Sequence, residues 1–145
     1  EFFMNDKCSA GTGKFLEVMA NRLNISMEEL NSLAKEHTEE VKISSMCTVF
    51  AESEVISLVG QGIERANIAY GILQSVAGKV VQMLGRLRDQ SPEVYLTGGL
   101  CEAAYFQEIL SEKIGKPIHS HKNARYAGAL GAAVLAKEQV EKGRM

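Results

Sequence analysis

The chain lacks several residues that mark large classes of protein. Its 145 residues include no tryptophan, two prolines and three cysteines, and aromatic residues make up 6% of the total. An odd number of widely spaced cysteines argues against a disulfide framework and favours the reducing cytoplasm. Sixteen basic and eighteen acidic residues give a net charge of −2, with no block of lysine or arginine. Weak basic character and few aromatic residues argue against a nucleic-acid partner.

The chain also lacks a segment that could enter a membrane. Its longest apolar run, residues 126–136, is too short to span a bilayer, and no secretory signal is visible. A length of 145 residues suits one domain, which should bury about 70% of its unfolded surface. The first residues, Glu1 to Met4, read as a strand already under way. We therefore interpret residues 1–145 as one domain, and as a fragment of, or a domain cut from, a longer protein.

Strands and helices alternate along the predicted structure. Short apolar runs followed by turn residues predict strands, and apolar residues at helical spacing predict helices. The predicted strands are residues 1–4, 41–43, 93–96 (a buried strand) and 117–119. The predicted helices are residues 11–24, 26–37, 51–59, 64–88, 102–114 and 124–141. This order predicts an α/β fold with a mainly parallel sheet and packed helices.

Two local patterns within these helices predict particular contacts. Ser26, followed three residues later by Glu29, is a capping box for the second helix. Gly71, Gly78 and Gly85 recur at intervals of seven in the long fourth helix. Small residues in register usually mean that another element packs closely against the helix.

The most informative stretch runs from Asn5 to Phe15, N-D-K-C-S-A-G-T-G-K-F. Its turn, Gly11, Thr12 and Gly13, opens into a helix, and glycine lets backbone N–H groups approach an anion at the positive helix end. A second turn, Gly98-Gly99, follows a strand. Ligands of open α/β sheets bind at the carboxyl ends of strands, so both turns are expected to open on one cleft. The pair suits a nucleotide, with phosphates at residues 11–13 and adenosine near Gly98-Gly99.

Cys8 lies three residues before the first glycine turn. A thiol beside a helix N-terminus ionises readily, and its thiolate can bind a metal ion or a cluster. The residues alone leave the alternatives open, because glycine turns often only cap a helix, and a lone cysteine such as Cys8 or Cys47 is usually a small buried hydrophobe. Cys101 is interpreted as structural. Two interpretations remain open for Lys14, Glu52 and Glu54: each side chain either contributes to the cleft or lies on a solvated helix surface.

Four motifs together resemble one known family. They are N-D-K-C-S-A-G-T-G-K-F, S-S-M-C-T-V-F-A-E-S-E-V-I-S, L-T-G-G and N-A-R-Y-A-G-A-L-G-A-A, in this order over nearly the whole chain. The set resembles the BadF/BadG/BcrA/BcrD ATPase family, and within it the activators of 2-hydroxyacyl-CoA dehydratases. The resemblance implies a ribonuclease H-like ATPase fold similar to actin, Hsp70 and sugar kinases, of which this chain looks like the C-terminal half.

The resemblance also implies a metal cluster and a dimer. Family members are homodimers that hold one [4Fe–4S] cluster between subunits, with two cysteines from each, and Cys8 and Cys47 match those metal ligands. Two-fold symmetry would supply the other two of the four thiolates that such a cluster takes. Residues 126–133 match a family helix that packs small residues behind the site.

ATP or ADP with Mg²⁺ is the second cofactor that the resemblance implies. Gly98 and Gly99 match the adenosine motif of the family. Asp6 with residues 11–13 matches its second phosphate region, with Asp6 and Thr12 as the catalytic residues. The family's first phosphate loop is absent, because no D-x-G-[ST] occurs in the chain. We therefore expect the isolated chain to hydrolyse ATP poorly or not at all.

The function implied is that of an ATP-dependent iron–sulfur electron-transfer activator in the cytoplasm. Ferredoxin or flavodoxin would supply the electron, and the acceptor would be a 2-hydroxyacyl-CoA dehydratase or a benzoyl-CoA-type reductase. Two alternatives from other classes remain. One is a small-metabolite kinase half-domain of the same fold without a cluster, and the other is a structural dimerisation module with inert cysteines.

Overall fold

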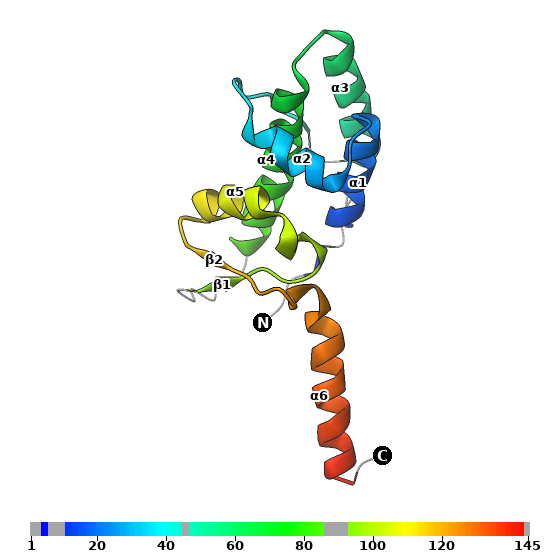
Figure 1. Ribbon diagram of the computed structural model, residues 1–145, viewed down its shortest axis with the longest axis vertical. Coiled ribbons are helices and arrows are strands. Elements are labelled where there is room, and N and C mark those ends of the chain that lie inside the picture. The colour runs from blue at the N-terminus through cyan, green and yellow to red at the C-terminus, as the bar shows by residue number, and fades with distance from the viewer. Residues whose placement is uncertain (1–3, 6–10, 45–46, 86–92, 144–145) are drawn as a thin grey trace.

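The computed structural model describes residues 4–5, 11–44, 47–85 and 93–143. Its elements are α1 (Thr12–Arg22), α2 (Met27–Lys35), α3 (Thr48–Gly60), α4 (Arg65–Leu84), β1 (Val94–Tyr95), η1 (Gly99–Glu102), α5 (Ala104–Ile114), β2 (Ile118–His119), η2 (Ala124–Tyr126) and α6 (Ala127–Glu141). Figure 1 shows α1 to α5 gathered in one body, the two strands below α5, and α6 projecting beyond them. The short η elements are 3-10 helices.

Helix α4 forms the centre of the body. Ten of its twenty residues are buried, and α1, α2, α3 and α5 all contact it. Burial is continuous from Ala66 to Leu73, which is typical of a helix covered on every side. The neighbouring helices bring one apolar face each, with Leu16 and Met19 of α1 and Leu30 of α2 completely buried. These contacts form the hydrophobic core.

Residues 41–43, predicted as a strand, form no strand in the structure. The stretch packs its backbone on α4 instead, where the carbonyl oxygen of Val41 occupies the space that a Cβ atom on Gly71 would need. The prediction of a strand was wrong, because the described strands β1 and β2 pair with each other and neither lies beside residues 41–43. Of Gly71, Gly78 and Gly85, Gly71 is the one that packs closely against another described segment. A Cβ atom on Gly78 would meet no described atom within 4 Å, and one on Gly85 would meet only carbonyls of its own helix.

Strands β1 and β2 pair in parallel, and α5 lies between them in the sequence. Val94 pairs with Ile118, and Tyr95 pairs with His119. A parallel pair joined through a helix confirms the predicted α/β arrangement. The strand predicted at residues 93–96 forms as Val94–Tyr95, but the prediction that it is buried was wrong, because Val94 is half-buried and 66% of the Tyr95 surface is exposed. Successive side chains of a strand point to opposite faces of a sheet, and the described residues leave the face that carries Tyr95 in solvent.

The local signal for the start of α2 is confirmed. The Ser26 hydroxyl accepts a hydrogen bond from the Glu29 N–H at 3.1 Å, and the Glu29 carboxylate accepts one from the Ser26 N–H at 2.7 Å. This reciprocal pair is the predicted capping box.

Of the first predicted strand, residues 1–3 lie outside the described residues, and Met4 belongs to no strand.

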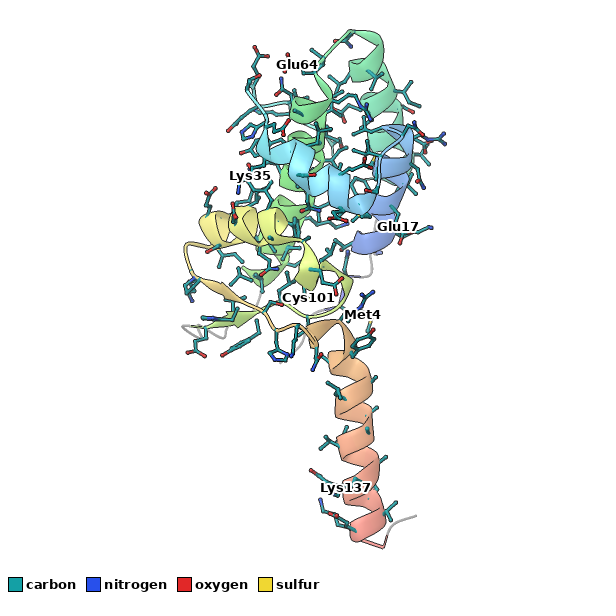
Figure 2. The ribbon with its side chains drawn as sticks, in the orientation of Figure 1. Met4, Glu17, Lys35, Glu64, Cys101 and Lys137 are labelled. Carbon is teal, nitrogen blue, oxygen red and sulfur yellow. The ribbon has the colours of Figure 1, made fainter. Side chains whose placement is uncertain are left out.

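Helix α6 stands apart from the body. None of its residues is buried, and more than half of the surface of Leu130 and Val134 is exposed. Figure 2 shows the side chains of α6, Lys137 among them, clear of the other elements. Residues 126–133 were expected to pack behind a site, but no described element covers the part of them that belongs to α6. No helix in that part combines the length and the apolarity that crossing a bilayer requires.

We expect Gly71→Ala to destabilise the fold. The new methyl group would collide with the Val41 carbonyl, and such overpacking typically costs about 1–3 kcal/mol. Gly78→Ala in the same helix is the matched control, because a methyl group there meets no described atom and alanine favours a helix by up to about 1 kcal/mol. Urea denaturation followed by circular dichroism measures both changes. Equal effects of the two substitutions would contradict the contact.

Candidate functional site

A cavity of about 550 Å³ lies between the start of α1 and the loop that follows β1. Thr12 and Gly13 line it from α1, Thr97 and Gly99 from the loop, and Arg125 from η2. The other described residues that line this α1 cavity are Glu17, Met27, Val80, Leu96, Leu100, Phe106 and Leu110. The fold thus brings the two glycine turns, which are far apart in the sequence, to one cavity.

The start of α1 gives the α1 cavity a positive wall. Gly11 precedes the helix and provides no side-chain cap, and a helix leaves the N–H groups of its first turn without intrahelical partners. These N–H groups, together with the helix dipole, favour an anion. Lys14 pairs with Glu17 at 2.8 Å on the exposed side of the helix. Lys14 is not among the described residues that line the cavity.

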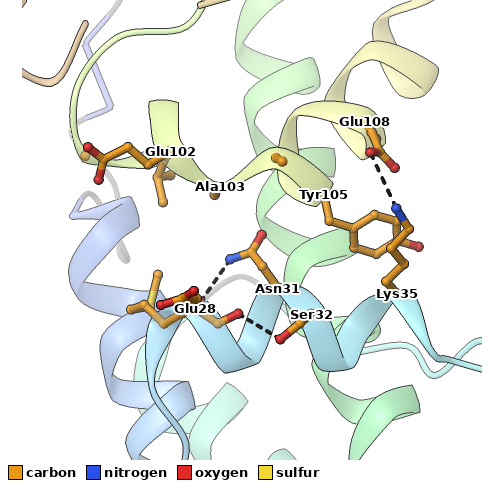
Figure 3. Close-up of a pocket in the computed structure, with 12 residues that line it drawn as sticks. Glu28, Asn31, Ser32, Lys35, Glu102, Ala103, Tyr105 and Glu108 are labelled. Carbon is orange, nitrogen blue, oxygen red and sulfur yellow. Dashed lines mark hydrogen bonds and ion pairs between the residues drawn. The ribbon is translucent and has the colours of Figure 1, made fainter. Parts of the chain in front are cut away.

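A second cavity, of about 590 Å³, adjoins the first and is shown in Figure 3. Met27, Gly99 and Leu100 line both cavities, so the two cavities are adjacent, with Gly99 at their common border, and together we call them the cleft. We call the second cavity the α2 cavity, because α2 supplies one of its walls and η1 with α5 supplies the other. Its remaining lining residues are Glu28, Asn31, Ser32 and Lys35 from α2, and Glu102, Ala103, Ala104, Tyr105 and Glu108 from the opposite wall.

The polar wall of the α2 cavity follows from the amphipathic sequence of α2. After Glu28, the α2 residues that line the cavity are Asn31, Ser32 and Lys35. They follow Glu28 by three, four and seven positions, and this spacing places all four on one face of a helix. Another face buries Leu30 in the core. The Asn31 amide nitrogen donates to the Met27 carbonyl at 3.0 Å, and its oxygen accepts from the Phe106 N–H at 3.3 Å. Asn31 therefore ties this wall to the start of α5.

Tyr105 and Lys35 add an aromatic and a cationic group to the α2 cavity. The Lys35 Nζ lies 3.8 Å from Glu108 Oε1 and 6.0 Å from the centre of the Tyr105 ring. Burial raises the pKa of Tyr105, and the nearby Tyr70, Glu112 and Glu108 raise it further. The phenol therefore stays protonated at neutral pH and can donate a hydrogen bond. An aromatic ring among polar groups of both signs suits a planar heterocycle.

The turn at Gly98 joins the cleft to the base of α6. Gly98 has φ of 86° and ψ of −169°, a conformation that is essentially restricted to glycine. Its N–H donates to the Ala124 carbonyl at 3.0 Å, and its carbonyl accepts from the Cys101 N–H at 3.1 Å. Ala124 begins η2, and Arg125 follows it directly. The turn therefore holds the backbone from which Arg125 reaches the α1 cavity.

Of the two predicted metal ligands, Cys47 lies in the described part of the chain and Cys8 lies outside it. Cys47 is half-buried and sits at the N-cap of α3. Helices α1 and α3 contact each other, and Arg22 forms an ion pair with Glu52 between them. Within the described residues, no group of three or more His, Cys, Asp or Glu side chains could hold a metal ion. Cys101 is buried and lines neither cavity.

Three predicted nucleotide-binding residues, Thr12, Gly13 and Gly99, line the cleft together. Gly11 and Gly98 flank the cleft and are not among its lining residues. The predicted catalytic residue Asp6 lies outside the described residues.

Some residues of the cleft were missed by reasoning from the sequence. The polar face of α2 had a visible signal, because its residues recur at helical spacing beside the apolar positions. Arg125 had no such signal, since its place depends on a contact with a distant turn. Glu52 and Glu54, considered as cleft residues, lie elsewhere: Glu52 pairs with Arg22, and Glu54 accepts a hydrogen bond from the Ser44 N–H at 2.7 Å.

Comparison with known proteins identifies relatives over nearly the whole chain. Residues 1–136 match the sequence profile of the BadF/BadG/BcrA/BcrD ATPase family. The (R)-2-hydroxyglutaryl-CoA dehydratase activating ATPase of Acidaminococcus fermentans is 44% identical over 141 residues, which cover 97% of this chain and 54% of that protein. The activator of lactoyl-CoA dehydratase from Anaerotignum propionicum is 42% identical, over 98% of this chain and 54% of that protein.

A solved structure shares the fold. The activator of the 2-hydroxyisocaproyl-CoA dehydratase from Clostridium difficile, with bound ADPNP, matches with a TM-score of 0.88 at 38% sequence identity. The match covers 99% of this chain and 53% of that one. The chain thus has the α/β fold of such activators and spans about half of the length of these relatives.

We expect Gly98→Ala to destabilise the protein by about 1–3 kcal/mol, because a side chain would force the turn out of a conformation reserved for glycine. The matched control is Gly99→Ala, since no described atom lies within 4 Å of a Cβ atom there and its φ is outside the left-handed region. Differential scanning calorimetry compares the two. A loss of stability at Gly99 as large as that at Gly98 would show that the turn does not depend on glycine at Gly98.

Proposed function

The chain belongs to the BadF/BadG/BcrA/BcrD ATPase family, and from this premise we propose that it is the C-terminal half of an ATP-dependent activator. The activated enzyme would be a 2-hydroxyacyl-CoA dehydratase or a related acyl-CoA reductase. The names of the relatives support this role. The observation that carries the proposal is that residues of both glycine turns line the α1 cavity, and that Gly99 also lines the adjacent α2 cavity.

The proposed ligand of the cleft is ATP or ADP. The phosphates would lie in the α1 cavity, where the N–H groups at Thr12 and Gly13 favour negative charge. The adenosine half would lie in the α2 cavity, between the polar face of α2 and Tyr105. Volumes of about 550 and 590 Å³ are of the size that small-molecule sites in proteins commonly have. Gly99, at the junction, has no side chain that would separate the two halves of the ligand.

Hydrolysis would need residues beyond those that line the cleft. Two described residues with a hydroxyl group, Thr12 and Thr97, line the α1 cavity. We propose Thr12 as the catalytic one, which could orient a water molecule or a phosphate oxygen. Asp6 is the proposed partner of Mg²⁺. The sequence has no D-x-G-[ST] loop, so this chain by itself would bind a nucleotide better than it would hydrolyse one.

Cys8 and Cys47 are the proposed ligands of a [4Fe–4S] cluster shared by two copies of the chain. Cys47 suits such a role because it sits at the N-cap of α3, where the positive helix end stabilises thiolate and cluster charge. When bound, the cluster would supply one-electron transfer at low potential.

The remaining partners are those that the resemblance to the family implies. Ferredoxin or flavodoxin would donate the electron, and the acyl-CoA enzyme would accept it after nucleotide exchange. The salt link of Arg22 with Glu52 and the contact of α1 with α3 connect the helix at the phosphates to the helix at Cys47. Nucleotide and cluster would therefore influence each other through α1 and α3.

We expect Gly99→Val to weaken ADP binding about tenfold or more, because two methyl groups would fill the junction of the cavities. Isothermal titration calorimetry on the full gene product measures the affinity, and thermal unfolding checks that the variant is folded. The matched control is Gly60→Val at the exposed end of α3, where no described atom lies within 4 Å of a Cβ atom. Unchanged ADP affinity in Gly99→Val would remove the nucleotide from this cleft.

Anaerobic reconstitution with iron and sulfide tests the cluster. We expect a brown protein with about four irons per dimer, and loss of colour and iron in Cys8→Ala and in Cys47→Ala. Cys101→Ala is the matched control, because Cys101 is buried and is not one of the proposed ligands, so this variant should keep the cluster. Binding of ADP without iron in the unaltered protein would instead favour the kinase alternative. Binding of neither would favour the structural alternative.

A further inference from the structure

Arg125 is the one cationic side chain among the described residues that line the α1 cavity. It shares that lining with Thr12 and Gly13, at the positive end of α1. A guanidinium group and a helix N-terminus are independent sources of positive potential, and here both border the same space. The one anionic group in the lining, Glu17, is already paired with Lys14.

Arg125 holds a carboxylate in the structure. Its Nη1 lies 3.2 Å from both carboxylate oxygens of Glu102. Glu102 lines the α2 cavity, so this ion pair links the linings of the two halves of the cleft. About half of each side chain is exposed, 46% for Arg125 and 55% for Glu102. Exposed ion pairs of this kind are weak, and the pair can therefore be exchanged for a better one.

The backbone at Arg125 is held in place while its side chain is accessible. The preceding residue, Ala124, is buried and accepts a hydrogen bond from the Gly98 N–H at 3.0 Å. The Arg125 Cζ lies 5.5 Å from the centre of the Tyr126 ring, which supports the guanidinium group on one side. A new partner for Arg125 would therefore require only a rotation of the side chain, and little ordering would be needed on binding.

We propose that Arg125 binds a phosphate group of the nucleotide in the α1 cavity, exchanging the Glu102 carboxylate for phosphate oxygens, and that it thereby sets the preference for a phosphorylated ligand over a nucleoside. In the structure one guanidinium nitrogen, Nη1, contacts both oxygens of Glu102. The planar guanidinium fork can present two N–H groups to two oxygens of a phosphate. The inference rests on the proposed function, because it takes the occupant of the cleft to be a nucleotide.

The test compares ADP with adenosine by isothermal titration calorimetry on the full gene product. In Arg125→Ala the affinity for ADP falls about ten- to a hundredfold, the usual loss for a hydrogen-bonded charge contact. The affinity for adenosine stays the same, because adenosine has no phosphate group for Arg125 to bind. Arg125→Lys gives an intermediate ADP affinity, since it keeps the charge and loses the fork.

Two further variants separate this role from a structural one. Glu102→Gln removes the competing carboxylate, so the ratio of ADP to adenosine affinity rises about two- to fivefold, in line with the weakness of an exposed pair. Lys137→Ala is the matched control. It removes another ion-paired surface cation, 3.8 Å from Glu141, which lines neither cavity, and it leaves both affinities unchanged.

The results distinguish a failure of the proposed nucleotide function from a failure of the proposed role of Arg125. If the unaltered protein binds neither ADP nor adenosine, the proposed nucleotide function is overturned, and the role of Arg125 with it. If the unaltered protein binds both, and Arg125→Ala keeps its ADP affinity or loses affinity for ADP and adenosine equally, the role of Arg125 alone is overturned. An equal loss would mean that Arg125 only supports the turn at Gly98.

Discussion

The geometry of the cleft depends on the burial of α4. Helices α1, α2 and α5 supply most of the cleft walls, and all three pack on α4. Hydrophobic burial is not directional, but close packing permits few arrangements of helices. The contact at Gly71, where the Val41 carbonyl occupies the space of a side chain, shows how closely the core is filled. The cleft walls are held at fixed positions because their apolar faces share this core.

Packing on α4 also decides which residues remain for binding. Each amphipathic helix packs its apolar face into the core. Its polar face or its N-terminus therefore remains accessible and can line the cleft. Helix α2 contributes a polar face, and α1 contributes its start. Two adjacent glycines then serve different purposes. Gly98 supplies a backbone conformation that is essentially restricted to glycine, whereas Gly99 lines both cavities at their common border.

What could be predicted from the sequence was local. The capping box of Ser26 and Glu29, the helices and the parallel arrangement depend on neighbouring residues or on the order of elements, and the structure confirms them. Residues 41–43 have the composition of a strand, but their state is decided by α4, which lies far along the chain. The role considered for Glu52 failed similarly, because the side chain finds Arg22 instead. Arg125 belongs to the fourth family motif, but nothing in that motif placed it in the cleft, since only the folded chain brings it to the α1 cavity.

The position of α6 has a mechanical consequence. Its fifteen residues form a rod of about 22 Å, at 1.5 Å per residue, and its root at η2 is fastened to the turn at Gly98. A tilt of about 10° at that root would displace the far end by about 4 Å, from the same rise per residue. Small adjustments of the loop beside the cleft would thus be magnified along α6 (Figure 1). A surface that packs on the far end of α6 would therefore be displaced by several ångströms when the turn at Gly98 changes its conformation.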